Sequence, residues 1–130
     1  MNDQNLFGAM MKMGQDWAKS MNLDAPDLKA FEDLWPTMPA DAMETFFGKG
    51  LNPEGLDAKT RLLLTLAALT VLGAQAETQI RLTVRHLIAA GATQAEIAET
   101  IAQMGMFGGM PAMNKAMELA NEVFEKDEAE

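Results

Sequence analysis

The feature that most constrains the fold is the run Leu-Leu-Leu-Thr-Leu-Ala-Ala-Leu at 62–69, which is apolar on nearly every side of a helix. Asp57 is a suitable N-cap before this run and Gly73 a suitable terminator after it, so we expect one helix over 58–72. A helix that is apolar nearly all round is buried on several sides. A chain of 130 residues buries a limited fraction of its surface, so we expect some of those sides to meet another subunit.

The remainder of the chain also predicts helices. Apolar residues recur at three- and four-residue spacing, whereas alternating β-branched runs and Asn-Gly turns are missing. Thr93 and Glu96 have the spacing of a capping box, which marks the start of a helix. The further helices are expected at about 6–21, 25–34, 40–47, 76–90, 94–104 and 111–124, with Gly105 and then Gly108-Gly109 ending the one that begins after Thr93.

These segments predict an all-α helical bundle of about six to seven helices. The length suits one structural domain. Within it, the turn-forming residues of 48–55 separate an N-terminal helical arm, residues 1–55, from a compact core, residues 56–125. Residues 126–130 form an acidic tail.

The charge of the chain argues against several classes of partner. The formal net charge is −9 and the pI is about 4.5, which disfavours binding to nucleic acid or to an anionic membrane surface. The longest apolar stretch, 62–74, is shorter than the roughly 20 residues that span a bilayer, and the first residues do not resemble a secretory signal. We therefore expect a cytoplasmic protein that interacts with neither nucleic acid nor membrane.

The absence of cysteine excludes thiol catalysis, disulfides and cysteine metal sites. No second histidine or carboxylate cluster has metal-ligand spacing, and no phosphate-binding glycine motif is present. We expect neither a metal nor a cofactor. The 12 methionines are interpreted as core-filling residues, with a methionine-lined binding groove as the alternative.

His86, the one histidine, is the candidate for proton transfer. A helical wheel places Thr83 and His86 on one flank of a buried face and Arg81 and Arg85 on the other. An imidazole at the margin of a core can exchange protons near neutral pH. The alternative is a structural histidine that caps the helix or lies in an interface, since imidazolium is favoured near a helix C-terminus.

The three arginines are candidates for binding a small anionic substrate. All of them lie in the two central predicted helices, whereas the other seven of the ten basic residues are lysines outside 61–91. The planar guanidinium suits a carboxylate. The alternative is that they pair with Glu77 or with acidic residues of another subunit. These arginines are Arg61, Arg81 and Arg85.

Residues 56–124 resemble the carboxymuconolactone decarboxylase family. The resemblance rests on L-x₄-R-x-L-x-x-L-A-A-L at 56–69, on Gly-Ala-Thr at 91–93 followed by Glu96-Ile97, and on Gly-Met-Pro-Ala at 109–112 with Ala116 and Val123-Phe124 beyond. It implies an alkylhydroperoxidase D-like helical bundle that assembles as a trimer or hexamer. One branch of the family decarboxylates 4-carboxymuconolactone in aromatic catabolism, and another reduces peroxides with Cys-x-x-Cys.

The chain departs from the motifs of both branches. The redox cysteines would fall at Ala76 and Gln79, so thiol peroxidase chemistry is impossible. The redox branch's glutamate would fall near Leu64. The family histidine would fall at Thr83, and His86, one helical turn on, could take over its role. A hydroxyl at Thr83 could orient water or substrate but could not replace an imidazole as base.

The leading functional hypothesis is a carboxy-lyase that decarboxylates a small carboxylated substrate, or handles a lactone, without a cofactor. His86 would transfer the proton, with Thr83 beside it. Arg81, Arg85 and Arg61 would bind carboxylates. Two alternatives stay open, a non-catalytic oligomeric family member and a small-molecule binding protein. The latter would use a pocket lined by Met104, Met106, Phe107 and Met110.

Overall fold

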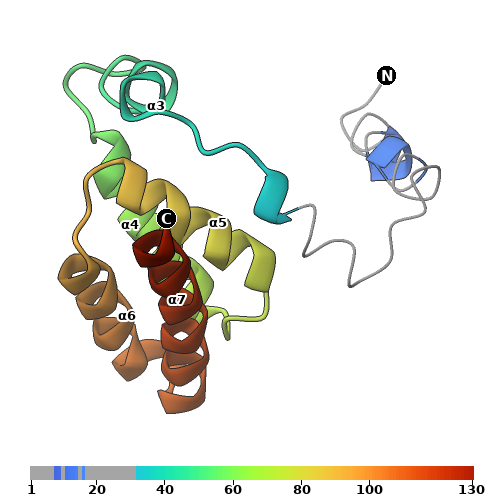
Figure 1. Cartoon of the computed structure of the whole chain (residues 1–130), viewed down its shortest axis with the longest axis vertical. Coiled ribbons are helices and arrows are strands. Elements are labelled where there is room, and N and C mark those ends of the chain that lie inside the picture. Colours follow the sequence, from blue (N-terminus) through green and yellow to red (C-terminus); the bar gives the residue numbers. More distant parts are fainter. Residues whose placement is uncertain (1–7, 10, 15, 17–31) are drawn as a thin grey trace. The chain divides into compact units, whose positions relative to one another are not determined.

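The computed structural model describes residues 8–9, 11–14, 16 and 32–130. The described residues contain helices and no strand, which confirms the all-α prediction. The chain divides into two units, Met1–Trp35 and Pro36–Glu130. The second unit holds five helices, which are α3 (Ala40–Phe47), α4 (Ala58–Val71), α5 (Glu77–Ala89), α6 (Gln94–Gly108) and α7 (Met110–Ala129) (Figure 1).

Little of the first unit is described. The expected helices over 6–21 and 25–34 lie largely outside the described residues, although residues 8–9, 11–14, 16 and 32–34 are helical. The expected helix over 40–47 coincides with α3.

Helices α4 to α7 form a four-helix bundle. Helices α4 and α6 run parallel, because Lys59 and Glu96 pair near their first turns and Gly108 lies against Val71 at their ends. Helix α7 returns antiparallel to α6, and α5 packs against both α4 and α7. Figure 1 shows α7 between α6 and α5.

The core lies between these four helices and follows the predicted apolar faces. On α5, Ile80, Val84 and Leu87 are fully buried, and Ile88 packs against them partly buried. Fully burying such a side chain stabilises a fold by roughly 1.5–3 kcal/mol. The other fully buried side chains of the cluster include Leu66, Ile97, Ile101 and Ala120.

None of the described helices is both long and apolar enough to cross a membrane.

The predicted caps are present. The Asp57 side chain accepts a hydrogen bond from Thr60 N at 2.8 Å. Hydrogen bonding from the Thr60 side chain, and then from its backbone N–H, holds the pKa of Asp57 below its ordinary value. Thr93 and Glu96 form the reciprocal capping box. The Thr93 backbone N–H, and then Lys59, lower the pKa of Glu96. The first turns of α4 and α6 are therefore stabilised by their own side chains.

The prediction that Gly105 ends its helix is wrong, because α6 continues to Gly108. A Cβ at Gly105 would lie 2.8 Å from Met113 Sδ on α7, so the side chain of Met113 packs against this glycine inside the helix. Helix α7 begins at Met110, with a proline in its first turn, and continues through Ala129 into the expected acidic tail.

Helix α4 is not buried on all sides within one chain. Leu66 is fully buried, but Leu64 is 57% exposed and Leu72 is 77% exposed. The apolar sequence of α4 therefore covers more surface than its own chain encloses.

Candidate functional site

His86 lies on the last turns of α5 and uses both of its ring nitrogens. Nδ1 lies 2.8 Å from the carbonyl oxygen of Leu82, one turn earlier. Nε2 accepts a hydrogen bond from the backbone N–H of Met38 at 3.1 Å. Because Met38 N can only donate, Nε2 is the acceptor and Nδ1–H is the donor.

This arrangement joins α5 to the segment that leads into α3. A proton can reach Nε2 only when the Met38 contact breaks, since both nitrogens are otherwise occupied by main-chain groups. A general acid or base must lie within hydrogen-bond reach of the proton that it transfers. The geometry therefore matches the structural alternative for His86 more closely than the catalytic one.

Thr83 lies one turn before His86 and is 9% exposed. Its position beside the fully buried Val84 places it at the edge of the core. A hydroxyl has no titration near neutral pH and cannot serve as the base.

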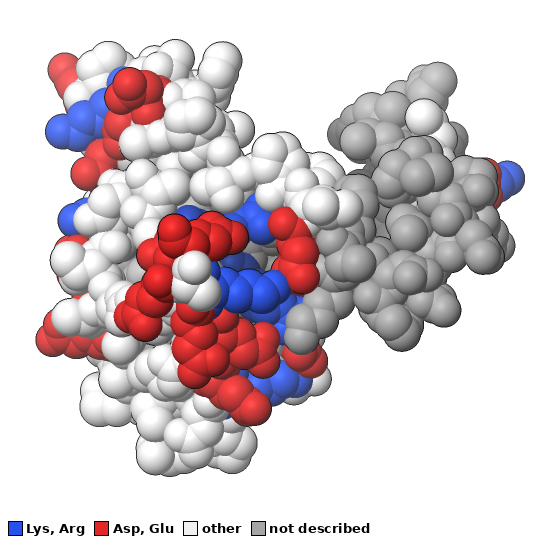
Figure 2. Space-filling model, in the orientation of Figure 1, with Lys and Arg blue, Asp and Glu red and all other residues white. Residues whose placement is uncertain are grey.

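Arg81 points toward α7 rather than toward His86. Its Nη1 lies 3.6 Å from Glu77 Oε1 and 3.5 Å from Glu122 Oε2, and Lys115 Nζ lies 3.4 Å from the other oxygen of Glu77. The pairing with Glu77 is the alternative left open by the sequence. Figure 2 shows acidic and basic side chains gathered over this part of the molecule.

The other two arginines are Arg85 and Arg61. Arg85 is half-buried one turn after Arg81. Arg61 is half-buried near the start of α4, where its Nε donates to the carbonyl of Leu56 at 3.0 Å. Because α4 and α5 are consecutive helices joined by a short turn, Arg61 lies at the level of the end of α5, whereas Arg81 lies near its beginning. Arg61 and Arg81 are therefore separated along the helix pair, and the Arg81 guanidinium lies against Glu77 and Glu122.

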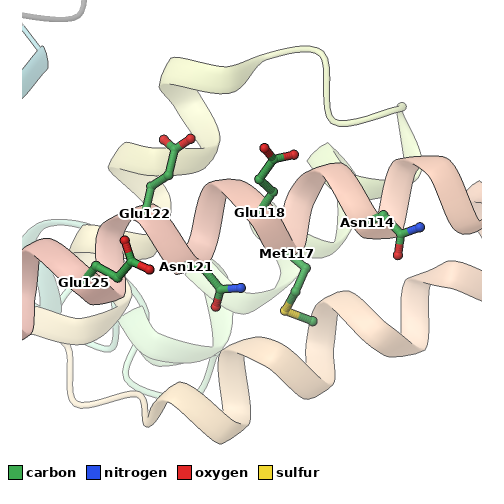
Figure 3. A pocket seen from close by; sticks show the side chains of 6 residues that line it. All are labelled: Asn114, Met117, Glu118, Asn121, Glu122 and Glu125. Carbon is green, nitrogen blue, oxygen red and sulfur yellow. The ribbon is translucent and has the colours of Figure 1, made fainter.

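A hollow of about 410 Å³ runs along the outer side of α7 (Figure 3). No pattern in the sequence predicted this hollow. Three of its six lining residues are carboxylates, so it disfavours an anionic substrate. Its lining residues are Asn114, Met117, Glu118, Asn121, Glu122 and Glu125.

The proposed methionine pocket is an exposed surface. Met106 is 81% exposed, Phe107 66% and Met110 59%, whereas Met104 is half-buried. Side chains this open to solvent do not enclose a small molecule.

Glu44 has a structural role that sequence reasoning missed. Its Oε1 accepts a hydrogen bond from Ala58 N at 2.7 Å, and its Oε2 accepts one from Lys49 N at 2.8 Å. Glu44 thereby joins α3, the loop after it and the first turn of α4. No pattern in the sequence marks this contact, because it links residues 14 positions apart.

No group of three or more histidine or acidic side chains within the described ranges, 8–9, 11–14, 16 and 32–130, could hold a metal ion.

The comparisons with known proteins agree with this fold. A family model for the carboxymuconolactone decarboxylase family matches residues 38–122. An uncharacterised 15.0 kDa protein in the nqo9–nqo10 intergenic region of Paracoccus denitrificans is 57% identical over 129 residues, 98% of this chain and 96% of that protein. The 4-carboxymuconolactone decarboxylase of Acinetobacter baylyi is 37% identical over 78 residues, which span 60% of this chain and 57% of that enzyme. The chain belongs to the carboxymuconolactone decarboxylase family.

Proposed function

We propose that this protein is a cytoplasmic member of its family that forms a homo-oligomer and has no histidine-dependent catalytic activity. The observation that carries the proposal is the engagement of both His86 ring nitrogens by main-chain groups. The buried Thr83 at the position expected for the family histidine supports it.

The assembly part of the proposal rests on exposed apolar surface. Single chains rarely leave large contiguous apolar patches in water. Leu64 on α4, Leu72 directly after α4 and Phe107 on α6 are each more than half exposed. A trimer or hexamer would cover part of this surface.

The test is turnover of 4-carboxymuconolactone by the purified oligomer, with the Acinetobacter decarboxylase as the positive control. We expect no carbon dioxide release above the uncatalysed rate. The variant Thr83→His adds an imidazole at the position of the family histidine, and activity gained there would identify this position as the cause of the loss. Turnover by the parent protein would overturn the proposal.

A second candidate is a cofactor-free decarboxylase-like or lactone-handling enzyme. The 37% identity to a decarboxylase favours it, as do the half-buried arginines of α4 and α5. Here His86 would have to leave Met38 during turnover, so His86→Gln would lower the rate by about 10²–10⁴. Lysine at Arg81, Arg85 or Arg61 would mainly raise KM, because an ammonium cannot reproduce a bidentate contact.

A further inference from the structure

The two longest stretches of the sequence without a charged residue are each 15 residues long. Residues 62–76 and 100–114 contain no Asp, Glu, Lys or Arg, although the chain holds 19 acidic and 10 basic residues. One stretch covers most of α4 and the turn after it. The other covers the end of α6 and the start of α7.

The fold brings these two stretches together. A Cβ at Gly108 would lie 2.9 Å from Val71 Cα and 3.3 Å from Thr70 O, so the backbones at the ends of α4 and α6 are in close contact. Gly109, with φ of 92°, then turns the chain directly into α7. The ends of α4 and α6 and the start of α7 therefore form one side of this end of the bundle, next to the Glu77–Lys115 pair at the start of α5.

Large apolar side chains are exposed at this end, which we name the charge-free end. Figure 2 shows an uncharged surface at the lower end of the molecule. A patch of this kind, rimmed by polar surface, marks an interaction site in a soluble protein. It consists of Val71 (38% exposed), Leu72 (77%), Met106 (81%), Phe107 (66%) and Met110 (59%).

We infer that the charge-free end is the surface at which a second copy of this chain binds, an inference that rests on the proposed homo-oligomer. Each copy has a formal net charge of −9, so two copies repel each other wherever carboxylates face carboxylates. In a two-fold contact the same patch meets itself. An uncharged patch therefore brings copies together without placing like charges opposite each other.

The outer side of α7 shows the opposite case. Glu118, Glu122 and Glu125 line its hollow, and a two-fold contact there would set three carboxylates of each copy against those of the other. At the charge-free end, the unbranched side chains of Met106 and Met110 can adapt to a partner surface. The net charge also disfavours an anionic membrane as the occupant.

The experiment introduces one carboxylate at the charge-free end and compares it with the same change elsewhere. Leu72→Glu and Phe107→Glu alter residues that are 77% and 66% exposed, and Leu51→Glu and Phe46→Glu alter residues that are 67% and 70% exposed near α3. Each pair therefore matches in residue type, exposure and added charge. Circular dichroism verifies that all four variants stay helical.

Sedimentation equilibrium at micromolar concentration measures assembly. We expect the parent and the α3 variants to be equally oligomeric, and the variants of the charge-free end to have a dissociation constant at least tenfold higher. Equal assembly in all five proteins would overturn the inference and leave the homo-oligomer intact. Equal loss in all four variants would also overturn it, because the effect would not be local. A monomeric parent would overturn the proposed homo-oligomer itself.

Discussion

The two ends of the parallel α4–α6 pair differ in whether their side chains have partners within the chain. At the N-terminal end, the Asp57 side chain caps α4, and Lys59 Nζ lies 3.1 Å from Glu96 Oε2 across the pair. At the C-terminal end, Gly108 lies against Val71, and Leu72 beside it is 77% exposed.

The side chains of the charged end therefore find partners within one chain, whereas the apolar side chains of the charge-free end stay exposed. The polar groups at the charged end already make hydrogen bonds and an ion pair within the chain, so few of them are available to bind another molecule. Apolar groups at the second end stay in water, where each exposed CH₂ is unfavourable by about 0.8 kcal/mol relative to burial. Substitutions made at one end or the other can measure how much each contributes to the stability of the single chain.

The largest change in the free energy of unfolding is expected in the middle of the α4–α6 pair, between its two ends. Ile101 on α6 is fully buried, so Ile101→Ala leaves a cavity and should lower the free energy of unfolding by about 2–5 kcal/mol. Met106→Ala, one and a half turns on and 81% exposed, should change it by less than about 0.5 kcal/mol. Urea denaturation below the concentration of assembly checks both. Equal losses would show that Met106 is buried in the single chain in solution.

The next largest loss of stability is expected from a substitution where the backbones approach closely at the charge-free end. Gly108→Ala places a methyl group against Val71 Cα, which should lower the free energy of unfolding by about 1–3 kcal/mol. Gly105→Ala meets only the flexible end of Met113 and gains about 1 kcal/mol of helix propensity, so its net change should be smaller. Thermal unfolding of both variants measures the difference. A Gly108→Ala protein as stable as Gly105→Ala would contradict the close approach.

A smaller effect is expected at the charged end, and it depends on pH. The pKa values of Asp57 and Glu96 are lowered in the folded chain by hydrogen bonds to Thr60 and Thr93. The unfolded chain therefore binds more protons once the pH falls to the ordinary values of 3.8 and 4.5, and the stabilisation disappears as the pH falls further.

The double variant Asp57→Asn, Glu96→Gln lacks this stabilisation at every pH. Its melting temperature should lie below that of the parent at pH 7, and the gap should narrow below about pH 4.5. The other carboxylates are common to both proteins and cancel in the difference. A gap that is constant from pH 7 to pH 3 would show that these caps do not require the charged form.

The fold was largely predictable because its signals are local. Caps, glycine terminators and three- to four-residue apolar spacing lie within a few positions of one another, and the structure confirms those at Asp57, Gly73 and Thr93. The prediction that Gly105 ends its helix was wrong because a glycine inside a helix and a glycine at its end cannot be distinguished from the sequence alone. Only the packing of Met113 against it distinguishes the two.

The site was less predictable because its contacts join distant positions. The wheel placed Arg81 and His86 on opposite flanks of the helix, but it could not identify Met38, 48 positions earlier, as the hydrogen-bond donor to His86. It also could not identify Glu122 as a partner of Arg81. Proton transfer by His86 and substrate binding by Arg61, Arg81 and Arg85 stay predictions.

The smallest effect is expected where α5 meets α7, and it bears on whether Arg81 can bind a substrate. Arg81 and Glu122 side chains are 14% and 42% exposed, with 3.5 Å between charged atoms. A double-mutant cycle with Arg81→Gln and Glu122→Gln should therefore give a coupling energy of only about 0.2–1 kcal/mol, and 1 M salt should reduce it. Such a weak pair could release the guanidinium to a carboxylated ligand at little cost in stability. A coupling above about 2 kcal/mol, unaffected by salt, would instead commit Arg81 to joining the two helices, and the second candidate function would lose one of its three binding groups.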